Sequence, residues 1–541
     1  MMLRRDYRRS IILGTAAFAA VFLFMALAVF ALLSFDVGAS AAGVMDAYTL
    51  RILRFTLYQA TLSTLLSIAL GLPVALALAR RKEFPGRIWI IRLMAVPMGL
   101  PVIVGAFGII TIWGRQGVLN SALVFAGADE PFSIYGLSGI LIAHVFFNLP
   151  LSVRLMLAGL ERIPGEYWRM AASLGMGPVS VFRFIEWPAV SRLIPGIAGL
   201  VFMLCATSFT LVLLLGGGPA ATTLEVAIYQ ALRFDFDPQR AIALSVLQIV
   251  LTAVLLGLLA FLPSPEAEIS SLGRNIRRFD GRTTGARLWD GAAIVFAVFL
   301  VGLPLVAIAV SGLQADLSRL LIAPIFLRAA TTSLLIAMLS AILVVLCCMA
   351  IIGARQAIGS RRQLAWPFGL LSALLGAGSS LVLLVPPVVL GSGWFLLLRV
   401  FGDVSFYAPV LVALINMLMA LPLAMRVMEP AFTSHFLRTG RLSASLGLQG
   451  YSRLRFADLP VLWRPMLMAL SFAMALSLGD LGAVALFGSK NFVTLPWLVY
   501  SNMGSYRTND AAGYAFLLGV VCLLLAAGGT SRQSPSARAG I

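Results

Sequence analysis

Long apolar runs recur along the whole chain of 541 residues. A helix rises about 1.5 Å per residue, so about 20 apolar residues cross the roughly 30 Å hydrocarbon layer of a membrane. The chain is 60% hydrophobic and only 11% charged, far more apolar than an average soluble domain. We therefore expect an all-α polytopic membrane protein with about twelve transmembrane helices, over residues 11–34, 52–79, 88–113, 136–160, 193–215, 240–262, 290–311, 328–353, 367–398, 405–428, 465–487 and 511–529.

A polar segment between these spans occurs twice. Residues 166–188 read EYWRMAASLGMGPVSVFRFIEWP, and residues 438–460 read RTGRLSASLGLQGYSRLRFADLP. Gly447 follows Gly175 by 447 − 175 = 272 residues, which is also the distance from Pro188 to Pro460. An even number of spans separates the copies, so both have the same orientation and the chain is a parallel repeat.

Charge sets the predicted orientation and the division of the chain. The formal charge of +18 comes from arginine clusters in alternate short loops, so no nucleic-acid partner is expected. The positive-inside rule places these loops, both termini and both repeated segments in the cytoplasm. The longest polar stretch, 263–289, is interpreted as a cytoplasmic linker between two halves of six spans, 1–262 and 290–541.

The first repeated segment is expected to form a short hairpin of two helices. Pro164 suits a helix start, Glu166 lies at the positive end of the dipole, and Gly175 supplies a left-handed stop. Pro178 begins the second helix and Pro188 ends it. Two pairs of opposite charge are expected to share a helix face because their members stand three residues apart: Arg183 with Glu186, and Arg455 with Asp458.

The chain lacks the residues for its own chemistry. A phosphate-binding P-loop needs Gly-Lys followed by Ser or Thr, but Lys82 and Lys490 are followed by Glu83 and Asn491. The two histidines, His144 and His435, lie in different halves, and the four cysteines fall within spans. We expect no catalytic residue, no bound cofactor and no metal site.

The repeated segments resemble the EAA loop with which permeases of ABC importers dock into their ATPase. The resemblance is carried by Glu166, Ala171 and Gly175 and by the later Phe182 and Pro188. It implies that the loop transmits closure of an ATPase dimer to the spans. The implied coupling residues are Glu166, Ala171, Ala172, Gly175, Met176, Phe182, Pro188, Ser443, Ala444, Gly447, Leu448 and Pro460. The second copy departs from the pattern, with Arg438 in the place of Glu166 and Ser443 in the place of Ala171.

A wider resemblance covers nearly the whole chain. Segments such as HVFFNLP at 144–150, GGGPAATTLEVAIYQAL at 216–232 and SLGDLGAVALFG at 477–488 are similar to the fused, two-half permeases of bacterial thiamine importers. The resemblance implies two type I ABC importer (MetI-like) halves in a bacterial inner membrane. It also implies a periplasmic thiamine-binding protein, two copies of a cytoplasmic ATPase that uses ATP, and uptake of thiamine or its phosphates.

The outer loops and one acidic residue suggest where cargo is delivered. Leu224, Ala227 and Ile228 follow the spacing of an amphipathic helix, which either seats the binding protein or only anchors the bundle. The candidate docking residues are Glu225, Tyr229, Arg233, Asp235, Asp237, Trp497, Tyr500 and Arg507. Asp480, an acid within a span, either lines the path or pairs with an arginine; the other candidate path residues are His144, Asn148 and Ser208.

Three other functions stay open at this point. A fused iron(III) permease shares the double EAA layout and differs in cargo. A secondary transporter also uses parallel repeats of six spans, but it would carry coupled sets of intramembrane acids. A membrane enzyme would need a convergent catalytic constellation, and the sequence offers none.

Overall fold

The computed structural model describes residues 2–34, 46–115, 117–127, 133–261, 278–359, 366–448, 450–488 and 492–530. No strand occurs in these ranges, so the all-α prediction is confirmed. The chain forms two compact units. Unit 1 comprises Met1–Val44, Ile228–Ile249 and Ala315–Ile541, and unit 2 comprises Met45–Ala227 and Val250–Gln314.

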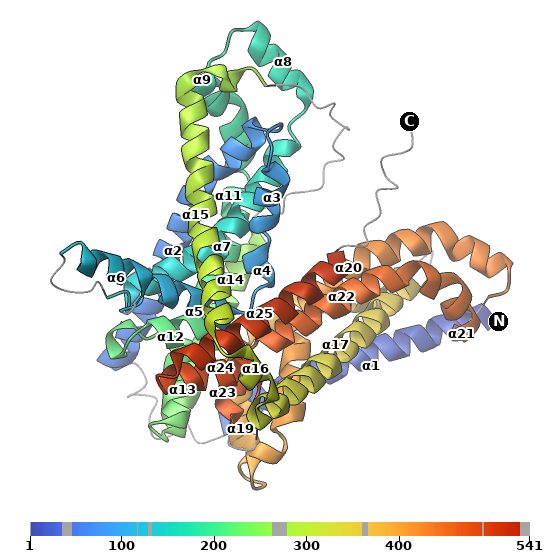
Figure 1. Ribbon diagram of the computed structural model, residues 1–541. Helices are drawn as coiled ribbons and strands as arrows, with labels where there is room; N and C mark the ends of the chain where they lie inside the picture. Colours follow the sequence, from blue (N-terminus) through green and yellow to red (C-terminus); the bar gives the residue numbers. More distant parts are fainter. Residues whose placement is uncertain are drawn as a thin grey trace. The chain divides into compact units, whose positions relative to one another are not determined.

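Unit 2 is built around α2 and α7, which pack along each other and against α11 (Figure 1). Small residues on α2 allow this approach: an added Cβ at Gly71 would lie 3.4 Å from Cβ of Ser152 on α7. The helices of this unit are α2 (Ala47–Arg80), α3 (Arg87–Leu93), α4 (Val96–Gly99), α5 (Val102–Trp113), α6 (Val118–Phe125), α7 (Leu137–Glu161), α8 (Gly165–Ser173), α9 (Pro178–Val181), α10 (Trp187–Ser191), α11 (Ile194–Ala206), α12 (Thr210–Leu215) and α15 (Thr284–Gln314), with the short turns η1 (Phe182–Glu186), η2 (Pro219–Ala221) and η3 (Asp280–Arg282).

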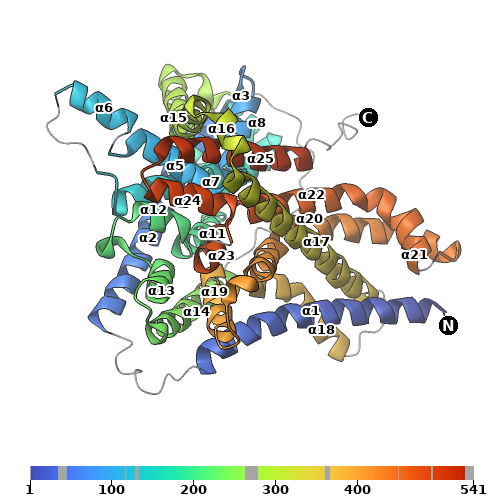
Figure 2. The same ribbon diagram turned by 60° about the horizontal axis from the view of Figure 1, so that its bottom comes forward.

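Unit 1 is built around α17, α20 and α22. The pair α20 and α22 leads to the short α21 at one end of the unit (Figures 1 and 2). The helices of this unit are α1 (Met2–Ser34), α16 (Leu317–Ile322), α17 (Pro324–Gly359), α18 (Trp366–Leu381), α19 (Pro387–Leu398), α20 (Ala408–Ser445), α21 (Gly450–Arg453), α22 (Leu459–Gly479), α23 (Gly482–Phe487), α24 (Leu495–Gly504) and α25 (Thr508–Thr530), with η4 (Val382–Leu384), η5 (Val404–Phe406) and η6 (Leu454–Asp458). Two further helices, α13 (Leu224–Arg233) and α14 (Pro238–Phe261), contribute residues to both units.

The compact units do not follow the chain order of the predicted halves. Helix α1 packs on α17 and α19, whereas α15 packs on α2 and α5, so the first span of each half joins helices of the other half. Close backbone contacts fix both arrangements: a Cβ at Gly393 would lie 2.2 Å from the carbonyl oxygen of Ala28, and one at Gly108 would lie 2.6 Å from that of Pro304. In the predicted linker, residues 263–277 lie outside the described residues, and 278–289 contain η3 and the start of α15.

The number of continuous spans differs from the predicted twelve. Ten described helices are long and apolar enough to cross a membrane, or eleven if Pro178–Ser191 and Ile194–Ala206, bent by 53°, form one span. The predicted span 88–113 breaks into α3, α4 and α5, and the predicted span 367–398 breaks into α18, η4 and α19. Proline is the physical reason, because Pro101 caps α5 and Pro386 caps α19, and proline has no N–H for a helical hydrogen bond.

The backbone confirms the internal repeat to the residue. The wide turns η1 and η6 begin 454 − 182 = 272 residues apart, and so do α12 and α23, at 482 − 210 = 272. Gly175 and Gly447 both adopt left-handed conformations, with φ of 63° and 65°. The two halves therefore share their irregular features as well as their spans.

Candidate coupling and docking sites

The first hairpin lies at the end of unit 2 where α15 begins, and its turn has the geometry expected of Gly175 (Figure 1). The N–H of Met176 donates to the carbonyl of Ala171 at 2.9 Å, and the N–H of Gly175 donates to that of Ala172 at 3.2 Å. This is a Schellman-type helix stop, which needs the left-handed residue. Ala171 is buried with Trp168 and Val181 in a small apolar core, against which Met176 also packs.

The second hairpin has the same turn as the first. Its first helix, however, is not a separate element. The N–H of Leu448 donates to the carbonyl of Ser443 at 3.0 Å, as Met176 does in the first copy. The preceding helix is continuous with α20, because Phe436 stands at the position where Pro164 caps α8. Ser443 is buried at 3% exposure, so the departure from alanine places a hydroxyl in the core of the hairpin. The side chain of Ala444 lies outside the described part of the structure.

The prediction that Pro188 ends its helix is wrong. A π-turn, η1, precedes it, and α10 continues to Ser191 with Pro188 in its first turn. The wider turn closes with the N–H of Trp187 donating to the carbonyl of Phe182, which lets the helix accommodate a proline without an N–H. The same turn precedes Pro460 in the second copy.

The π-turn also redirects the acidic residue that ends it. Glu186 was expected to face Arg183, but it is fully buried and binds Arg278 and Arg80 instead. Asp458 was expected to face Arg455, but it contacts His435 and Arg453. In a π-turn residues three apart no longer share a face, so the spacing rule for an α-helix does not apply.

The surfaces of both hairpins carry matched apolar side chains that the sequence patterns did not reveal. Met170, Leu174 and Phe184 are 61%, 73% and 65% exposed. Their counterparts 272 residues later are 60%, 65% and 67% exposed; they are Leu442, Leu446 and Phe456. Of the other predicted coupling residues, Phe182 and Leu448 are half-buried, and the exposed ones are Glu166, Ala172, Gly175, Pro188, Gly447 and Pro460. Exposed apolar groups at matched positions are typical of a protein interface.

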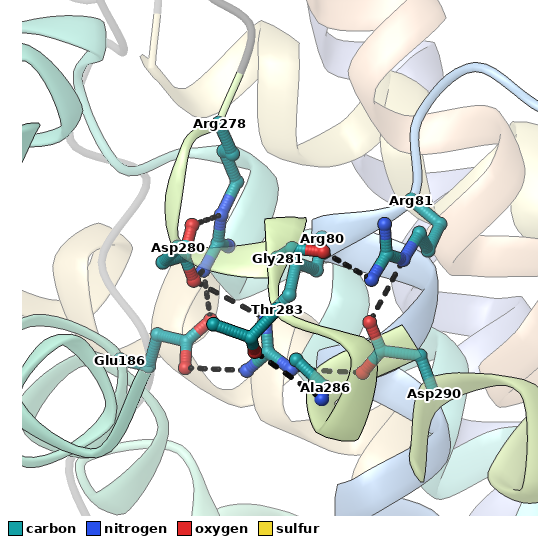
Figure 3. A network of polar contacts seen from close by, with 9 residues as sticks. All are labelled: Arg80, Arg81, Glu186, Arg278, Asp280, Gly281, Thr283, Ala286 and Asp290. Carbon is teal, nitrogen blue, oxygen red and sulfur yellow. Dashed lines mark hydrogen bonds and ion pairs between the residues drawn. The ribbon is translucent and has the colours of Figure 1, made fainter. Parts of the chain in front are cut away.

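A buried ionic network ties the first hairpin to two spans (Figure 3). At its hairpin end, Arg278 donates to Glu186 at 2.5 Å and to Asp280 at 2.6 Å, and its guanidinium lies 3.9 Å from the centroid of the Trp168 ring. Arg80, at the end of α2, donates to Asp280 at 3.2 Å and contacts Glu186 at 3.5 Å. One carboxylate of the hairpin thus holds two arginines from other elements.

The network continues to the start of α15. Arg80 also donates to Asp290 on α15 at 2.8 Å. Arg81 donates to the other oxygen of Asp290 at 2.9 Å and to the carbonyl of Gly281 at 2.5 Å (Figure 3). The network therefore joins the hairpin to α2 and α15 through side chains that are mostly buried.

Opposite charges balance within the network, which joins three arginines and three carboxylates. Burial alone would raise the pKa of Asp280, but the hydrogen bonds and charge of Arg278 and the charge of Arg80 hold it below its ordinary value. Burial opposes the charged form of Arg278, yet Asp280 and Glu186 raise its pKa overall. Such a set is costly to break because removal of one partner leaves an uncompensated buried charge.

The predicted path residues His144 and Asn148 lie between helices and hold them together. His144 is 1% exposed, and its Nδ1 lies 2.8 Å from Oγ of Ser63 on α2. Asn148 donates to Sγ of Cys205 on α11 at 3.3 Å, and it is 6% exposed. In unit 1 an equivalent cluster joins three helices, with Asn416 donating to Ser477 at 2.9 Å and Ser340 3.0 Å from Ser477. Contacts of this kind are typical of polar groups that join helices within a membrane.

The other two predicted path residues lie at equivalent breaks in the helices. Ser208 precedes α12 and Asp480 precedes α23, and both are partly exposed. The carboxylate of Asp480 accepts the N–H of Gly482 at 3.1 Å and that of Ala483 at 3.3 Å. Asp480 therefore caps a helix start, and no arginine pairs with it among the described residues.

The outer helix α13 follows the predicted amphipathic pattern. Leu224, Ala227 and Ile228 are buried, as are Glu225 and Tyr229, which are 1% and 2% exposed. These last two side chains do not belong to a free docking surface. Arg233 is partly exposed and donates to the carbonyl of Gly488 at 2.8 Å. Of the remaining predicted docking residues, Asp235 and Arg507 are exposed, and Asp237, Trp497 and Tyr500 are partly exposed.

Two exposed aromatic residues that sequence reasoning missed adopt the left-handed conformation. Phe236 has φ of 52° and is 79% exposed, and Tyr506 has φ of 59° and is 93% exposed. Each stands two residues before the next helix, Phe236 before Pro238 and Tyr506 before Thr508. A left-handed non-glycine residue costs on the order of 1 kcal/mol, and no local pattern of the sequence indicates it.

A cavity of about 690 Å³ in unit 1 opens beside these outer helices. Its walls include Tyr229, Arg233 and Phe236 from the α13 region and Trp497 and Tyr500 from α24. Among the residues that the structure describes, no group of three His, Cys, Asp or Glu side chains could hold a metal ion.

The sequence of the chain matches known proteins over most of its length. The profile of the family "Binding-protein-dependent transport system inner membrane component" matches residues 67–263. The "Thiamine transport system permease protein ThiP" of Brucella abortus (strain 2308) is 47% identical over 488 residues, which are 90% of this chain and 88% of that protein. The proteins of the same name from Salmonella typhimurium and Escherichia coli are 44% and 43% identical, each over 480 residues, 89% of this chain and 88% of theirs.

These matches and the paired hairpins define an inner-membrane permease component of a binding-protein-dependent transport system. At this level of identity and coverage, the chain belongs to the family of thiamine transport system permease proteins.

The ionic network predicts a large penalty for neutralising Glu186. Glu186→Gln leaves Arg278 and Arg80 without their buried counter-charge, so the free energy of unfolding should fall by about 3–5 kcal/mol. Denaturant unfolding of the purified chain in detergent measures this loss. The double variant Glu186→Gln with Arg278→Gln should recover part of it.

A matched control lies on the same hairpin. Glu166 pairs with Arg169 in an exposed contact, so Glu166→Gln should change stability by less than about 0.5 kcal/mol. Equal losses from the two single substitutions, or strict additivity in the double variant, would contradict the network.

Proposed function

We propose that the chain is the translocating permease of an ATP-binding cassette importer for thiamine and its phosphates. The cargo assignment rests on relatives that are 43–47% identical over about nine tenths of the chain and are named as thiamine transport permeases. The chain itself supplies the membrane path, and separate subunits hydrolyse ATP. The positive-inside rule supports cytoplasmic termini and cytoplasmic hairpins.

The matched hairpins support docking of two ATPase subunits, one on each copy. Each hairpin exposes an apolar triplet, Met170, Leu174 and Phe184 in the first copy, next to a rigid glycine stop. An apolar knob of this kind fits a cleft on a soluble partner and buries its exposed area there. The ionic network then carries movement of the first hairpin to α2 and α15.

The outer loops support docking of a periplasmic binding protein. Phe236 and Tyr506 present aromatic side chains next to charged Asp235 and Arg507. Aromatic anchors with a polar rim are typical of interface hot spots. The strained backbone keeps both rings exposed, which pre-organises the surface for a partner.

We keep Asp480 and Ser208 as candidates for the path, because each stands at a helix break and is partly exposed. Broken helices are the places where irregular backbone lines a cavity within a membrane.

Reconstitution of the full chain with its ATPase in lipid vesicles tests the cargo assignment. A binding protein loaded with thiamine should stimulate ATP hydrolysis and drive thiamine uptake, and one loaded with ferric ion should do neither. Stimulation by the iron-loaded receptor alone would overturn the cargo. Uptake without nucleotide would overturn the importer class.

The coupling role predicts an effect of Gly175→Ala. The left-handed φ disfavours a Cβ by about 1 kcal/mol, so ATPase affinity should fall about fivefold. Affinity of the detergent-solubilised permease for the ATPase measures this. Gly177→Ala is the matched control, because Gly177 has φ of −75° and no atom within 4 Å of an added Cβ. Equal affinity of the two variants would argue against a coupling role of the turn.

The docking role predicts that Phe236→Ser and Tyr506→Ser weaken receptor binding. Loss of an aromatic anchor costs about 2 kcal/mol, or about thirtyfold in affinity. Titration of loaded receptor against ATPase stimulation measures the effect, while unstimulated hydrolysis should stay unchanged. Trp89→Ser is the control, because Trp89 is 70% exposed and lies on α3, directly after the arginine-rich segment 80–87 that is predicted to be cytoplasmic. If all three variants respond alike, the anchors are not specific.

A further inference from the structure

In both units an arginine contacts an aromatic ring and the acidic residue that ends the π-turn of the hairpin. In unit 2, Arg278 stacks on Trp168 and binds the carboxylate of Glu186. In unit 1, Arg453 lies 4.2 Å from the centroid of the Phe436 ring and 3.5 Å from a carboxylate oxygen of Asp458. Glu186 and Asp458 occupy the same place in the repeat, since 458 − 186 = 272.

The number of carboxylates that contact the arginine differs between the two units. Arg278 has a second carboxylate, Asp280, which accepts its Nε at 3.1 Å and its Nη2 at 2.6 Å. Asp458 is already held by His435 at 2.9 Å, and within the described residues neither Nε nor Nη2 of Arg453 makes a hydrogen bond, although both are buried. Arg453 thus has one distant carboxylate where Arg278 has two close ones, and its buried Nε–H and Nη2–H groups can donate to an oxygen-bearing anion.

A cavity of about 460 Å³ lies beside this arginine. It is bounded by α1, α17, α20 and the α21–η6–α22 segment. Arg9 of α1 and Arg453 bring two positive charges to it, against the single carboxylate of Asp458. The remaining wall is largely apolar and includes Leu13, Met349, Phe432, Leu462 and Met466.

The cavity lies at the polar end of α1, where an apolar span begins and lipid headgroups are expected. Arg9 stands at the polar start of a span that runs from Arg8 to Ser34, and Leu13, one turn further, is 64% exposed. Basic pockets between helices at this depth are suited to anionic lipid headgroups. A free phosphate would leave the apolar wall uncovered.

We propose that this cavity binds one anionic phospholipid. Its phosphate oxygens accept hydrogen bonds from Arg453 and Arg9, in the role that Asp280 has in unit 2. Its acyl chain covers the apolar wall formed with α17 and α22. The lipid links the second hairpin to α1 and α17, as the ionic network links the first hairpin to α2 and α15.

Native mass spectrometry of the full chain, delipidated and then titrated with phosphatidylglycerol, tests the site. The wild type should retain one phosphatidylglycerol, and Arg453→Gln should bind it about tenfold more weakly, because charge-assisted hydrogen bonds are lost. Arg464→Gln is the control, since Arg464 is exposed on α22 and does not line the cavity. Equal retention by wild type and Arg453→Gln would overturn the proposal.

A second variant tests the cavity without altering a charge. Gly353 lines it from α17 and has no atom within 4 Å of an added Cβ, so Gly353→Leu should fill the space and exclude the lipid. Thermal stabilisation by phosphatidylglycerol should be lost in this variant and in Arg453→Gln. Phosphatidylcholine or inorganic phosphate should not stabilise the wild type; stabilisation by phosphate to the same extent would show that the site is not one for lipid.

Discussion

In a hydrocarbon layer every backbone N–H and C=O needs a partner within the protein, and this constraint governs the whole structure. It explains the all-helical fold, and it also explains the side chains at each break in a helix. The N–H of Leu224, at the start of α13, donates to the hydroxyl of Thr56 at 3.1 Å, and the N–H of Leu495, at the start of α24, donates to that of Ser333 at 2.8 Å. In both halves, the first N–H of an outer helix therefore donates to a hydroxyl on a span that comes earlier in the chain.

The same constraint accounts for Asp480. A carboxylate within an apolar span was expected to serve the path or to pair with an arginine. Its two oxygens accept the amides that begin α23, and no arginine pairs with it among the described residues. A functional part for Asp480 is compatible with this role, because a capping carboxylate that stays partly exposed keeps lone pairs for a second contact.

Sequence patterns predicted the features that depend on neighbouring residues. The left-handed turn at Gly175, the amphipathic face of α13 and most spans follow from local spacing. The ionic network did not, since Arg80 and Asp290 lie 210 residues apart and a local pattern carries no information about their contact. The direction of Glu186 was also missed, because a π-turn shifts the helical register and cannot be distinguished from an α-helix by periodicity.

The two copies of the hairpin share an exposed apolar triplet and differ in how they attach to the rest of the protein, although exposed Glu166 is also replaced by exposed Arg438. Their exposed apolar triplets match. Glu186 joins a network of arginines and carboxylates whose charges balance, whereas Asp458 contacts His435. The first hairpin is joined to α2 and α15 by ion pairs, whereas the ion pairs of Asp458 lie within the segment from α20 to η6. A single fused chain permits this asymmetry, which a symmetric homodimer would not.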